Sequence, residues 1–322
     1  MSAHIFWCAL FFYFCRMSDS KTIAPVVLKV LLGLMFVVSA ILKLISIDQF
    51  EIYVYSYHFF SLNFSFLVAR AAIILELVLG IGLISNYLHK LMWWGSVAML
   101  GAYTLLLIYA LFLGRTDNCH CFGELLPFNP KQSLVKNVVL MALFLLVYRM
   151  KGKQTPFRWF GLIVVALTAT IAVFVVSPPD NYTDAYNPEN QMNTELFHEA
   201  LMEPPLDSLG LTEGKQVVCF FSTGCEYCQM AVHKLSLMQQ FYGFPAENIT
   251  CIFLGSEEGM ARFFEQSESE RYRSLMYKDV FKLLKISNGN LPLLVFLENG
   301  EVAHEYGFRN MREAEIKAFF ED

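Results

Sequence analysis

The sequence predicts a membrane-embedded bundle of α-helices followed by a water-exposed α/β domain. Of its 322 residues, 56% are apolar and only 16% are charged, whereas soluble domains carry about 25% charged residues. The charge also differs between the halves: residues 1–177 hold 13 Lys and Arg against 6 Asp and Glu, and residues 178–322 hold 11 against 23. The first half is therefore suited to a bilayer. The second half has a net charge of −12 and would repel phosphates, which argues against a nucleic-acid partner.

A membrane-spanning helix needs about 20 apolar residues. Five segments of the first half reach or approach this length: 25–47, 66–85, 91–113, 134–148 and 159–177. We expect a four-helix membrane domain over residues 25–150 and a fifth transmembrane helix within residues 151–177. Residues 1–24 form a separate amino-terminal segment, in which Met17 is an alternative start to Met1.

The basic residues of the short loops predict the orientation of the helices. Lys and Arg gather in YRMKGKQTPFR, residues 148–158, between the fourth and fifth segments. Loops rich in Lys and Arg stay on the cytoplasmic side. With five crossings, the loop over residues 114–133 and the whole α/β domain then lie outside. We expect a multi-pass protein of a bacterial inner membrane with its α/β domain in the periplasm.

Glu76 is an ionisable residue inside the second apolar segment. An acidic side chain in a bilayer costs a few kcal/mol unless it is paired or protonated, so it is a functional candidate. Glu76 either handles protons or forms a structural ion pair that joins the first two helices. Lys43 and Arg70 are basic residues that we expect nearer the outer surface.

The second half alternates between strand-like and helix-like runs. Residues 178–193 are rich in Pro, Asn and Asp and read as a linker, so the α/β domain covers residues 194–322. Strands are predicted at 215–223 and 249–255, helices at 224–241, 256–267, 279–286 and 311–322, and a hairpin at 291–307. Asn299-Gly300 suits the type I′ turn of that hairpin.

The first of these strands leads into CEYC, Cys225 to Cys228, at the start of a helix, and Leu291-Pro292 begins a later strand. This order resembles the thioredoxin family over about 130 residues. The resemblance implies a surface for client segments at Leu291 and at Pro292, with a cis peptide bond before the proline. It implies no bound cofactor in this domain.

The position of Cys225 suits a nucleophile. Unpaired N–H groups at a helix amino terminus stabilise a thiolate, which is the attacking species in disulfide exchange. Glu226 opposes this effect by its like charge, so we expect only a moderately lowered pKa for Cys225. Cys228, one turn further, is the expected resolving thiol. Glu226 and Tyr227 replace the Gly-Pro common in the family, so its redox potentials cannot be carried over.

A second cysteine pair lies in DNCHCFGE, residues 117–124, between the third and fourth apolar segments. Three interpretations of Cys119, His120 and Cys121 stay open. The cysteines form a tight, easily reduced disulfide; they bind a metal with His120, although three adjacent residues supply a tetrahedral shell poorly; or they pair with other thiols, including Cys225 in a mixed disulfide. Of these interpretations, we do not favour the metal site, and we expect no bound metal.

The membrane half also resembles a known family. GLMFVVSAILKLISIDQF, ILELVLGIGLI and CHCFGE, within about residues 25–148, are similar to the DoxX-like branch that includes the methylamine-utilisation protein MauE. Members are redox-associated membrane proteins. The architecture is also similar to bacterial vitamin K epoxide reductase-like proteins, in which a helical bundle is fused to a thioredoxin domain, but this bundle has two well-placed cysteines rather than four.

These features together predict a membrane thiol–disulfide oxidoreductase. Cys225 exchanges disulfides with client proteins, Cys119 and Cys121 exchange with Cys225 and Cys228, and a membrane quinone is the expected electron acceptor. One alternative is a reductive partner of the kind used in cytochrome c maturation. The other is a membrane anchor or carrier in which Cys119 and Cys121 form a structural bridge.

Overall fold

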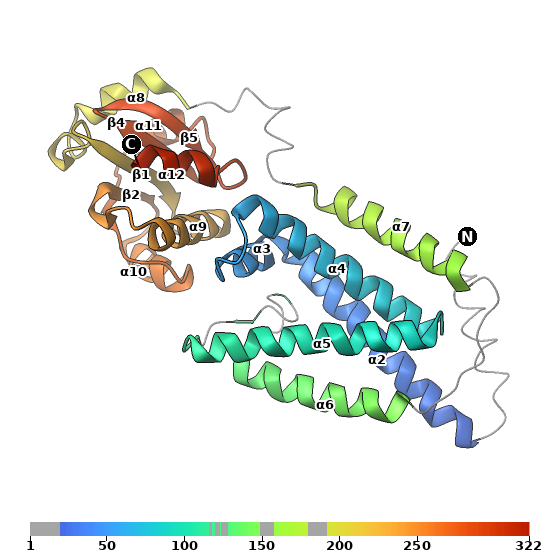
Figure 1. Ribbon diagram of the computed structural model, residues 1–322. Helices are drawn as coiled ribbons and strands as arrows, with labels where there is room; N and C mark the ends of the chain where they lie inside the picture. The colour runs from blue at the N-terminus through green and yellow to red at the C-terminus, as the bar shows by residue number, and fades with distance from the viewer. Residues whose placement is uncertain are drawn as a thin grey trace. The chain divides into compact units, whose positions relative to one another are not determined.

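The computed structural model describes residues 20–115, 118–119, 123, 128–148, 158–179 and 192–321 (Figure 1). The chain divides into two compact units. The first unit comprises Met1–Phe50 and Val68–Ser177, and the second comprises Glu51–Leu67 and Pro178–Asp322.

The amino-terminal region is helical. Its helices are α2 (Ser20–Ile45), α3 (Ile47–Tyr55), α4 (Leu62–Ile84), α5 (His89–Phe112), α6 (Pro130–Tyr148) and α7 (Arg158–Val176). Four helices among the described residues are long and apolar enough to cross a membrane: Val26–Ile45, Leu62–Ile84, His89–Phe112 and Trp159–Val176. The first, second, third and fifth predicted segments are thereby confirmed as apolar helices, and the chain is a membrane protein.

The fourth predicted segment is a helix, α6, but it is not among the four membrane-spanning candidates. The structure therefore does not establish a fifth crossing, and the orientation that depends on five crossings stays a prediction. The short helix α3 was not predicted, since IDQFEIYVY reads as part of a loop rather than as a membrane segment.

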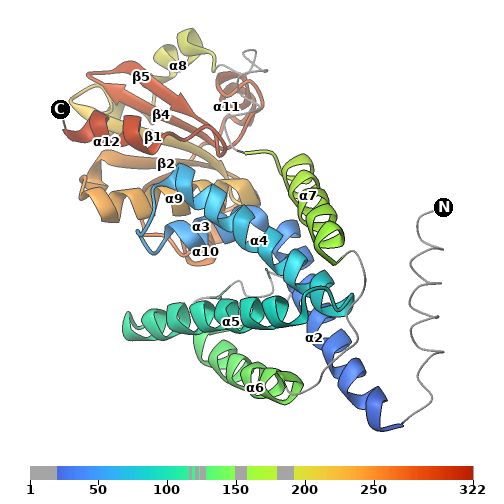
Figure 2. The ribbon, with the colours of Figure 1, turned by 45° about the vertical axis from the view of Figure 1, so that its right-hand side comes forward.

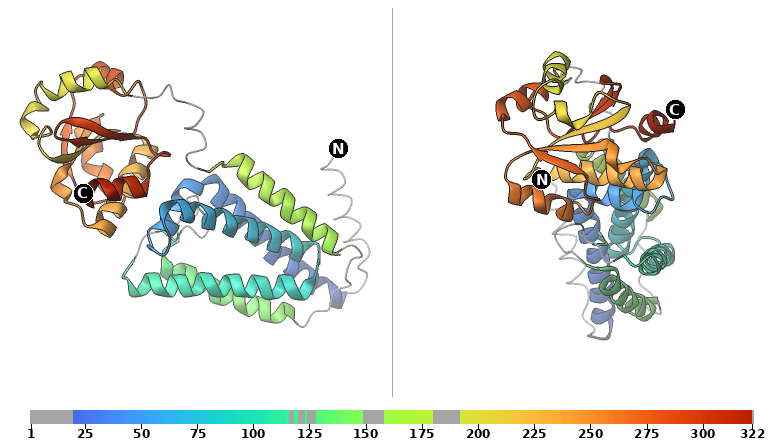
Figure 3. Two further views of the ribbon diagram at one scale, coloured as in Figure 1. Left: turned by 45° about the horizontal axis from the view of Figure 1, so that its top comes forward. Right: turned by 90° about the vertical axis from the view of Figure 1, so that its left-hand side faces the viewer.

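Close contacts between helices hold the first unit together. A Cβ atom added to Gly33 of α2 would lie 2.7 Å from the carbonyl oxygen of Gly80 in α4, so these two glycines let the backbones approach. Helices α5 and α6 run side by side (Figure 3). The indole Nε1 of Trp93 donates a hydrogen bond to the carbonyl oxygen of Phe144 at 2.8 Å. The helices of this unit therefore pack through small residues and buried polar contacts.

A five-stranded sheet organises the second unit. Its strands are β1 (Lys215–Ser222), β2 (Ile249–Leu254), β3 (Arg273–Met276), β4 (Leu293–Glu298) and β5 (Glu301–Tyr306), in the spatial order β3-β2-β1-β4-β5. Strand β1 is parallel to β2 and antiparallel to β4. Its helices are α8 (Thr194–Leu201), α9 (Glu226–Tyr242), α10 (Glu257–Gln266), α11 (Val280–Ile286) and α12 (Glu313–Glu321). This topology confirms the predicted thioredoxin-like α/β fold.

Both faces of the sheet are covered, which explains the unbroken apolar run of β1. Val217, Cys219 and Phe221 pack in one core with α9, α10 and α12. Val218 and Phe220 alternate with them and pack in a second core with α8 and α11. In Figure 2, α8 and α11 lie apart from α9 and α10. Since successive side chains of a strand point to opposite faces, a strand buried on both sides is apolar throughout.

The β4–β5 hairpin has the predicted turn. Glu298 pairs with Glu301, which leaves Asn299 and Gly300 as the two turn residues, with φ angles of 53° and 88°. Two successive positive φ angles define a type I′ turn, so this prediction is confirmed. The turn fixes the register of β5.

The segment Glu51–Leu67 belongs to the second unit and is anchored there by Glu313. The carboxylate of Glu313 accepts hydrogen bonds from the Tyr55 hydroxyl at 2.8 Å, the Tyr242 hydroxyl at 2.6 Å and the Leu62 backbone N–H at 2.6 Å. Burial and the neighbouring Glu313 carboxylate raise the pKa of Tyr242 to about 12. Burial and the Glu313 carboxylate also raise the pKa of Tyr55, so both tyrosines are neutral donors at physiological pH.

Candidate redox site

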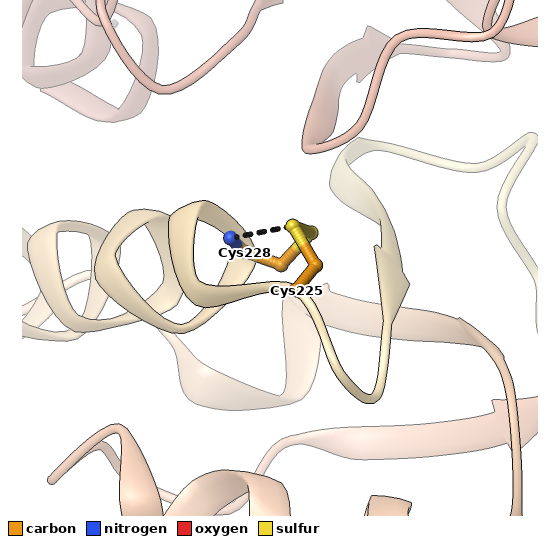
Figure 4. Close-up of a disulfide and its surroundings, with 2 residues drawn as sticks. All are labelled: Cys225 and Cys228. Atoms are coloured by element: carbon orange, nitrogen blue, oxygen red, sulfur yellow. Dashed lines mark hydrogen bonds between the residues drawn. A yellow bond between two sulfur atoms is a disulfide. The ribbon is translucent and has the colours of Figure 1, made fainter.

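Cys225 lies where β1 gives way to α9, and it is the N-cap residue of that helix. Its Sγ accepts a hydrogen bond from the backbone N–H of Cys228 at 3.1 Å (Figure 4). Cys225 and Cys228 form a disulfide. The Cys228 side chain is completely buried, whereas Cys225 is only partly buried. Of the two residues, only Cys225 is therefore accessible to an incoming thiolate.

The two residues between the cysteines are exposed. Tyr227 is 47% exposed, and its ring centroid lies 5.4 Å from that of Phe308. Glu226 begins α9 and places an acidic side chain in its first turn. The two predicted auxiliary residues thus lie beside the disulfide, and Tyr227 turns toward the loop after β5.

The Leu291–Pro292 peptide bond is cis, as the thioredoxin resemblance implies. Leu291, Pro292 and Tyr227 line one groove of about 270 Å³. Phe308 and Arg309, which no motif in the sequence singles out, line the same groove. The sequence shows only that they directly follow the hairpin. They lie about 80 residues after Cys225 and Cys228 in the chain, so no short motif connects them to the cysteines.

Cys119 is buried in the first unit. Its Sγ lies 2.8 Å from the hydroxyl of Ser133, in the first turn of α6, and its backbone N–H donates to the carbonyl oxygen of Phe128 at 2.9 Å. His120 and Cys121 lie outside the described residues. Among the residues described, no group of three His, Cys, Asp or Glu could hold a metal ion, and the three interpretations of the C-x-C remain open.

Gly123 fixes the same loop against the end of α2. It has a φ angle of +62°, and a Cβ atom there would lie 2.5 Å from the Ser46 hydroxyl and 2.6 Å from the Leu42 carbonyl oxygen. Any side chain at this position is therefore excluded both by space and by backbone conformation. Gly123 thus lies against the end of α2, and Cys119 lies against the start of α6.

Glu76 pairs with Lys43 inside the bundle, and both side chains are 2% exposed. Lys43 also donates to the Ser39 hydroxyl at 3.0 Å, and Tyr103 donates to Oε1 of Glu76 at 2.8 Å. Oε2 of Glu76 has no hydrogen-bond partner among the residues that the structure describes. The pair borders a cavity of about 20 Å³, which is room for one water molecule. The structural ion pair considered as an alternative is present.

Lys43 and Arg70 are buried, so their side chains do not reach the surface. Lys43 is held by Glu76. Arg70 is 1% exposed, and its Nε donates to the carbonyl oxygen of Ser177 at 3.2 Å. Burying a charged group without such partners would be strongly unfavourable. These contacts therefore explain why Lys43 and Arg70 are buried rather than directed to the surface.

Comparisons with known proteins agree with the two-part architecture. Residues 21–150 match the model of the family described as methylamine utilisation protein MauE, which confirms the predicted resemblance of the membrane half. About three quarters of the chain is similar to Protein TlpB of Flavobacterium psychrophilum. The two are 26% identical over 300 residues, with 76% of this chain and 81% of the relative covered.

Three solved structures are similar to part of the chain. The thioredoxin domain of a thiol-disulfide oxidoreductase from Bacteroides vulgatus is 16% identical, with 34% of this chain and 81% of that chain covered and a TM-score of 0.29. A secreted disulfide oxidoreductase of Mycobacterium tuberculosis is also 16% identical, with 36% and 84% covered and a TM-score of 0.27. A thiol:disulfide interchange protein from Bacteroides sp. is 14% identical, with 35% and 78% covered and a TM-score of 0.28.

Proposed function

We propose that the protein is a membrane-anchored thiol–disulfide oxidoreductase whose Cys225–Cys228 pair exchanges disulfides with client proteins outside the cytoplasm. One observation carries this proposal: a partly exposed Cys225 at a helix N-cap is disulfide-bonded to a fully buried Cys228. The groove with cis-Pro292 next to it supplies a surface for an extended client segment.

The exchange proceeds in two attacks. A client thiolate attacks Sγ of Cys225, the Cys225–Cys228 bond breaks, and the Cys228 thiolate leaves and takes up a proton. A second client thiolate then attacks the client sulfur of the mixed disulfide and releases Cys225 as a thiolate. Two electrons pass from the client to the cysteine pair. The N–H of Cys228, which already bonds Cys225 Sγ, stabilises that released thiolate.

Cys119 and Cys121 reoxidise the pair in the second part of this proposal. They accept the two electrons by the same exchange and pass them to a membrane quinone, so that two thiols and one quinone give one disulfide and one hydroquinone. The MauE match of residues 21–150 supports a redox role for the bundle. So does the cysteine distribution, because the membrane half from residue 25 to 177 holds no cysteines except Cys119 and Cys121. In the proposed membrane topology, α6 is a fifth crossing. The thioredoxin-like domain then lies on the periplasmic side of a bacterial inner membrane.

The Cys228→Ser variant is expected to trap the proposed circuit. Without the resolving thiol, Cys225 stays attached to its partner, so a covalent bond from Cys225 to Cys119 or Cys121 should accumulate. Mass spectrometry of membranes after rapid alkylation detects the linked peptides. Cys219 and Cys251 are 0% exposed. They serve as internal controls, because peptides that contain them should not be disulfide-linked.

The triple variant Cys119→Ser, Cys121→Ser, Cys228→Ser is the matched control, because it keeps Cys225 and removes only the proposed partners. Adducts with clients in both variants, and none within the chain, would refute the C-x-C step while leaving client exchange intact. Alkylation of untreated cells also gives the direction: a mostly reduced Cys225–Cys228 pair would favour the reductive alternative.

A further inference from the structure

One wall of the groove beside the disulfide is the loop over residues 307–310, which follows β5 and which we call the groove loop. All of its residues line the groove, as do Tyr227 and Pro292. A Cβ atom added to Gly307 would lie 3.6 Å from the carbonyl oxygen of Pro292. The ring centroid of Phe308 lies 5.4 Å from that of Tyr227. The groove loop therefore lies beside both the cis-proline and the residues between the cysteines, so its conformation sets the shape of the groove.

Lys234 of α9 supports the groove loop from the interior of the domain. Its side chain is 1% exposed, and it is not among the residues that line the groove. Its Nζ donates a hydrogen bond to the carbonyl oxygen of Phe308 at 3.2 Å and lies 3.9 Å from the centroid of the Phe308 ring. A cation is attracted to an aromatic face, and more strongly where water is excluded. Lys234 therefore holds both the main chain and the ring of Phe308.

The same amine also faces the segment Glu51–Leu67, which is docked on the domain. The Nζ of Lys234 lies 5.2 Å from the centroid of the Phe66 ring, and Phe66 is 4% exposed. In the first turn of α4, the backbone N–H of Leu62 donates to the carboxylate of Glu313 at 2.6 Å. Because Phe66 lies only about one turn further along this helix, the contact with Glu313 also fixes Phe66 over Lys234.

We propose that Lys234 is a positioning residue for client binding, through which the docked segment Glu51–Leu67 keeps the client groove in shape. The inference rests on the proposed function and adds a determinant of client affinity to it. Phe66 and Phe308 confine the Lys234 amine, and the amine in turn confines the groove loop. A loop that is ordered in advance loses less conformational entropy when a client binds. The sulfur chemistry is the two-electron exchange described above, and Lys234 takes no part in it.

The test measures client binding and sulfur exchange separately. The oxidised full-length protein in detergent is mixed with a reduced two-cysteine peptide, and the rate of peptide oxidation is followed as the peptide concentration rises. The half-saturating concentration reports how well the groove binds the peptide, and the limiting rate constant reports the exchange. Dithiothreitol is the second reductant, because this small dithiol reaches the disulfide without needing the groove. All variants are compared at a temperature at which circular dichroism shows them to be folded.

Lys234→Met should raise the half-saturating peptide concentration about fivefold, which is within the range of one net hydrogen bond. Methionine keeps an unbranched apolar chain at this position but cannot donate to the carbonyl oxygen of Phe308. The limiting rate constant and the rate with dithiothreitol should stay unchanged. Lys215→Met is the matched control, since the Nζ of Lys215 also lies over an aromatic ring, 5.4 Å from the Phe319 centroid, and Phe319 does not line the groove. An unchanged half-saturating concentration in Lys234→Met, an equal rise in Lys215→Met, or an equal slowing with both reductants would overturn the inference.

Phe66→Leu tests the link to the docked segment. Leucine keeps the position apolar but removes the ring from Lys234, so the half-saturating concentration should rise about twofold, the low end for a cation–π contact. In the Lys234→Met background the same substitution should have no further effect, because the changes at interacting residues are not additive.

Phe64→Leu is the matched control for Phe66→Leu. Phe64 lies on the same helix but is 50% exposed, and its ring centroid lies 5.2 Å from that of Phe60. Equal effects of Phe66→Leu in the two backgrounds, or equal effects of Phe64→Leu and Phe66→Leu, would overturn the coupling. If Lys234→Met does not fold, the comparison of Phe66→Leu with Phe64→Leu still decides.

The inference and the proposed function fail in different ways. If the wild-type protein oxidises neither dithiothreitol nor the peptide, thiol–disulfide exchange is refuted and the inference falls with it. If it oxidises dithiothreitol alone, the disulfide exchanges but the groove binds no peptide, which overturns the inference and leaves the exchange. If it oxidises both, and Lys234→Met binds the peptide as well as the wild type does, only the role of Lys234 is refuted.

Discussion

The Cys225→Ser variant is expected to lose client oxidation entirely, down to the rate of uncatalysed exchange. In the proposed exchange the client attacks Sγ of Cys225, and the buried Cys228 cannot replace it. The measurement is the rate of disulfide formation in a two-cysteine peptide by the full-length protein. Client adducts should disappear from membranes of cells that carry this variant.

The loss should occur without unfolding, which makes the result interpretable. Cys225 is the N-cap of α9 and accepts a hydrogen bond from the N–H of Cys228. Serine is among the best N-cap residues, so its hydroxyl can accept the same bond. The Cys225→Ser variant should unfold at the same temperature as the reduced wild-type protein.

Cys228→Ser is the control for the role of each thiol. It keeps the attacked sulfur, so it should form mixed disulfides with clients but fail to complete their oxidation. Full turnover by Cys225→Ser, or equal adduct formation by both variants, would contradict the assignment of Cys225 as the exposed, reacting residue.

Much of the thioredoxin-like fold could be predicted from local sequence patterns. The β-branched and aromatic runs predicted β1 and β2, and the Asn299-Gly300 pair predicted the β4–β5 hairpin. The short edge strand β3 was missed because its four residues, RSLM, are exposed or only partly buried and show no clear alternation. Helix α8 was not predicted because its eight residues cover too few turns for a helical spacing of apolar residues to be recognised.

The site was predictable only where its residues are close in sequence. Cys225 and Cys228 are three residues apart, so their motif is visible. Arg309 contacts Tyr227 because the fold brings the loop after β5 to the start of α9. No spacing in the sequence predicts that contact. Similarly, Lys43 and Glu76 are 33 residues apart, and the sequence left proton handling and ion pairing as equal alternatives for Glu76.

Removing one partner of the buried Lys43–Glu76 pair is expected to destabilise the bundle by about 3–5 kcal/mol, the usual result for an uncompensated buried charge. In Lys43→Met, the Glu76 carboxylate loses its ion pair and keeps the hydrogen bond from the Tyr103 hydroxyl. Low accumulation in membranes and a lower midpoint of unfolding in detergent would report the loss. An unchanged midpoint would show that the pair contributes little.

The double variant Lys43→Met, Glu76→Leu separates the structural role from a role in proton transfer. Replacing both charges by apolar groups of similar volume is often neutral or stabilising, so the double variant should accumulate near the wild-type level. If Glu76 serves only the ion pair, reoxidation of Cys225–Cys228 in these membranes should also be normal. If Glu76 carries protons released by Cys119 and Cys121, a folded double variant should accumulate its Cys225–Cys228 pair in the reduced form. Gel-shift alkylation of Cys225 and Cys228 in the two backgrounds decides between the alternatives, because stability and proton transfer are then measured on the same folded protein.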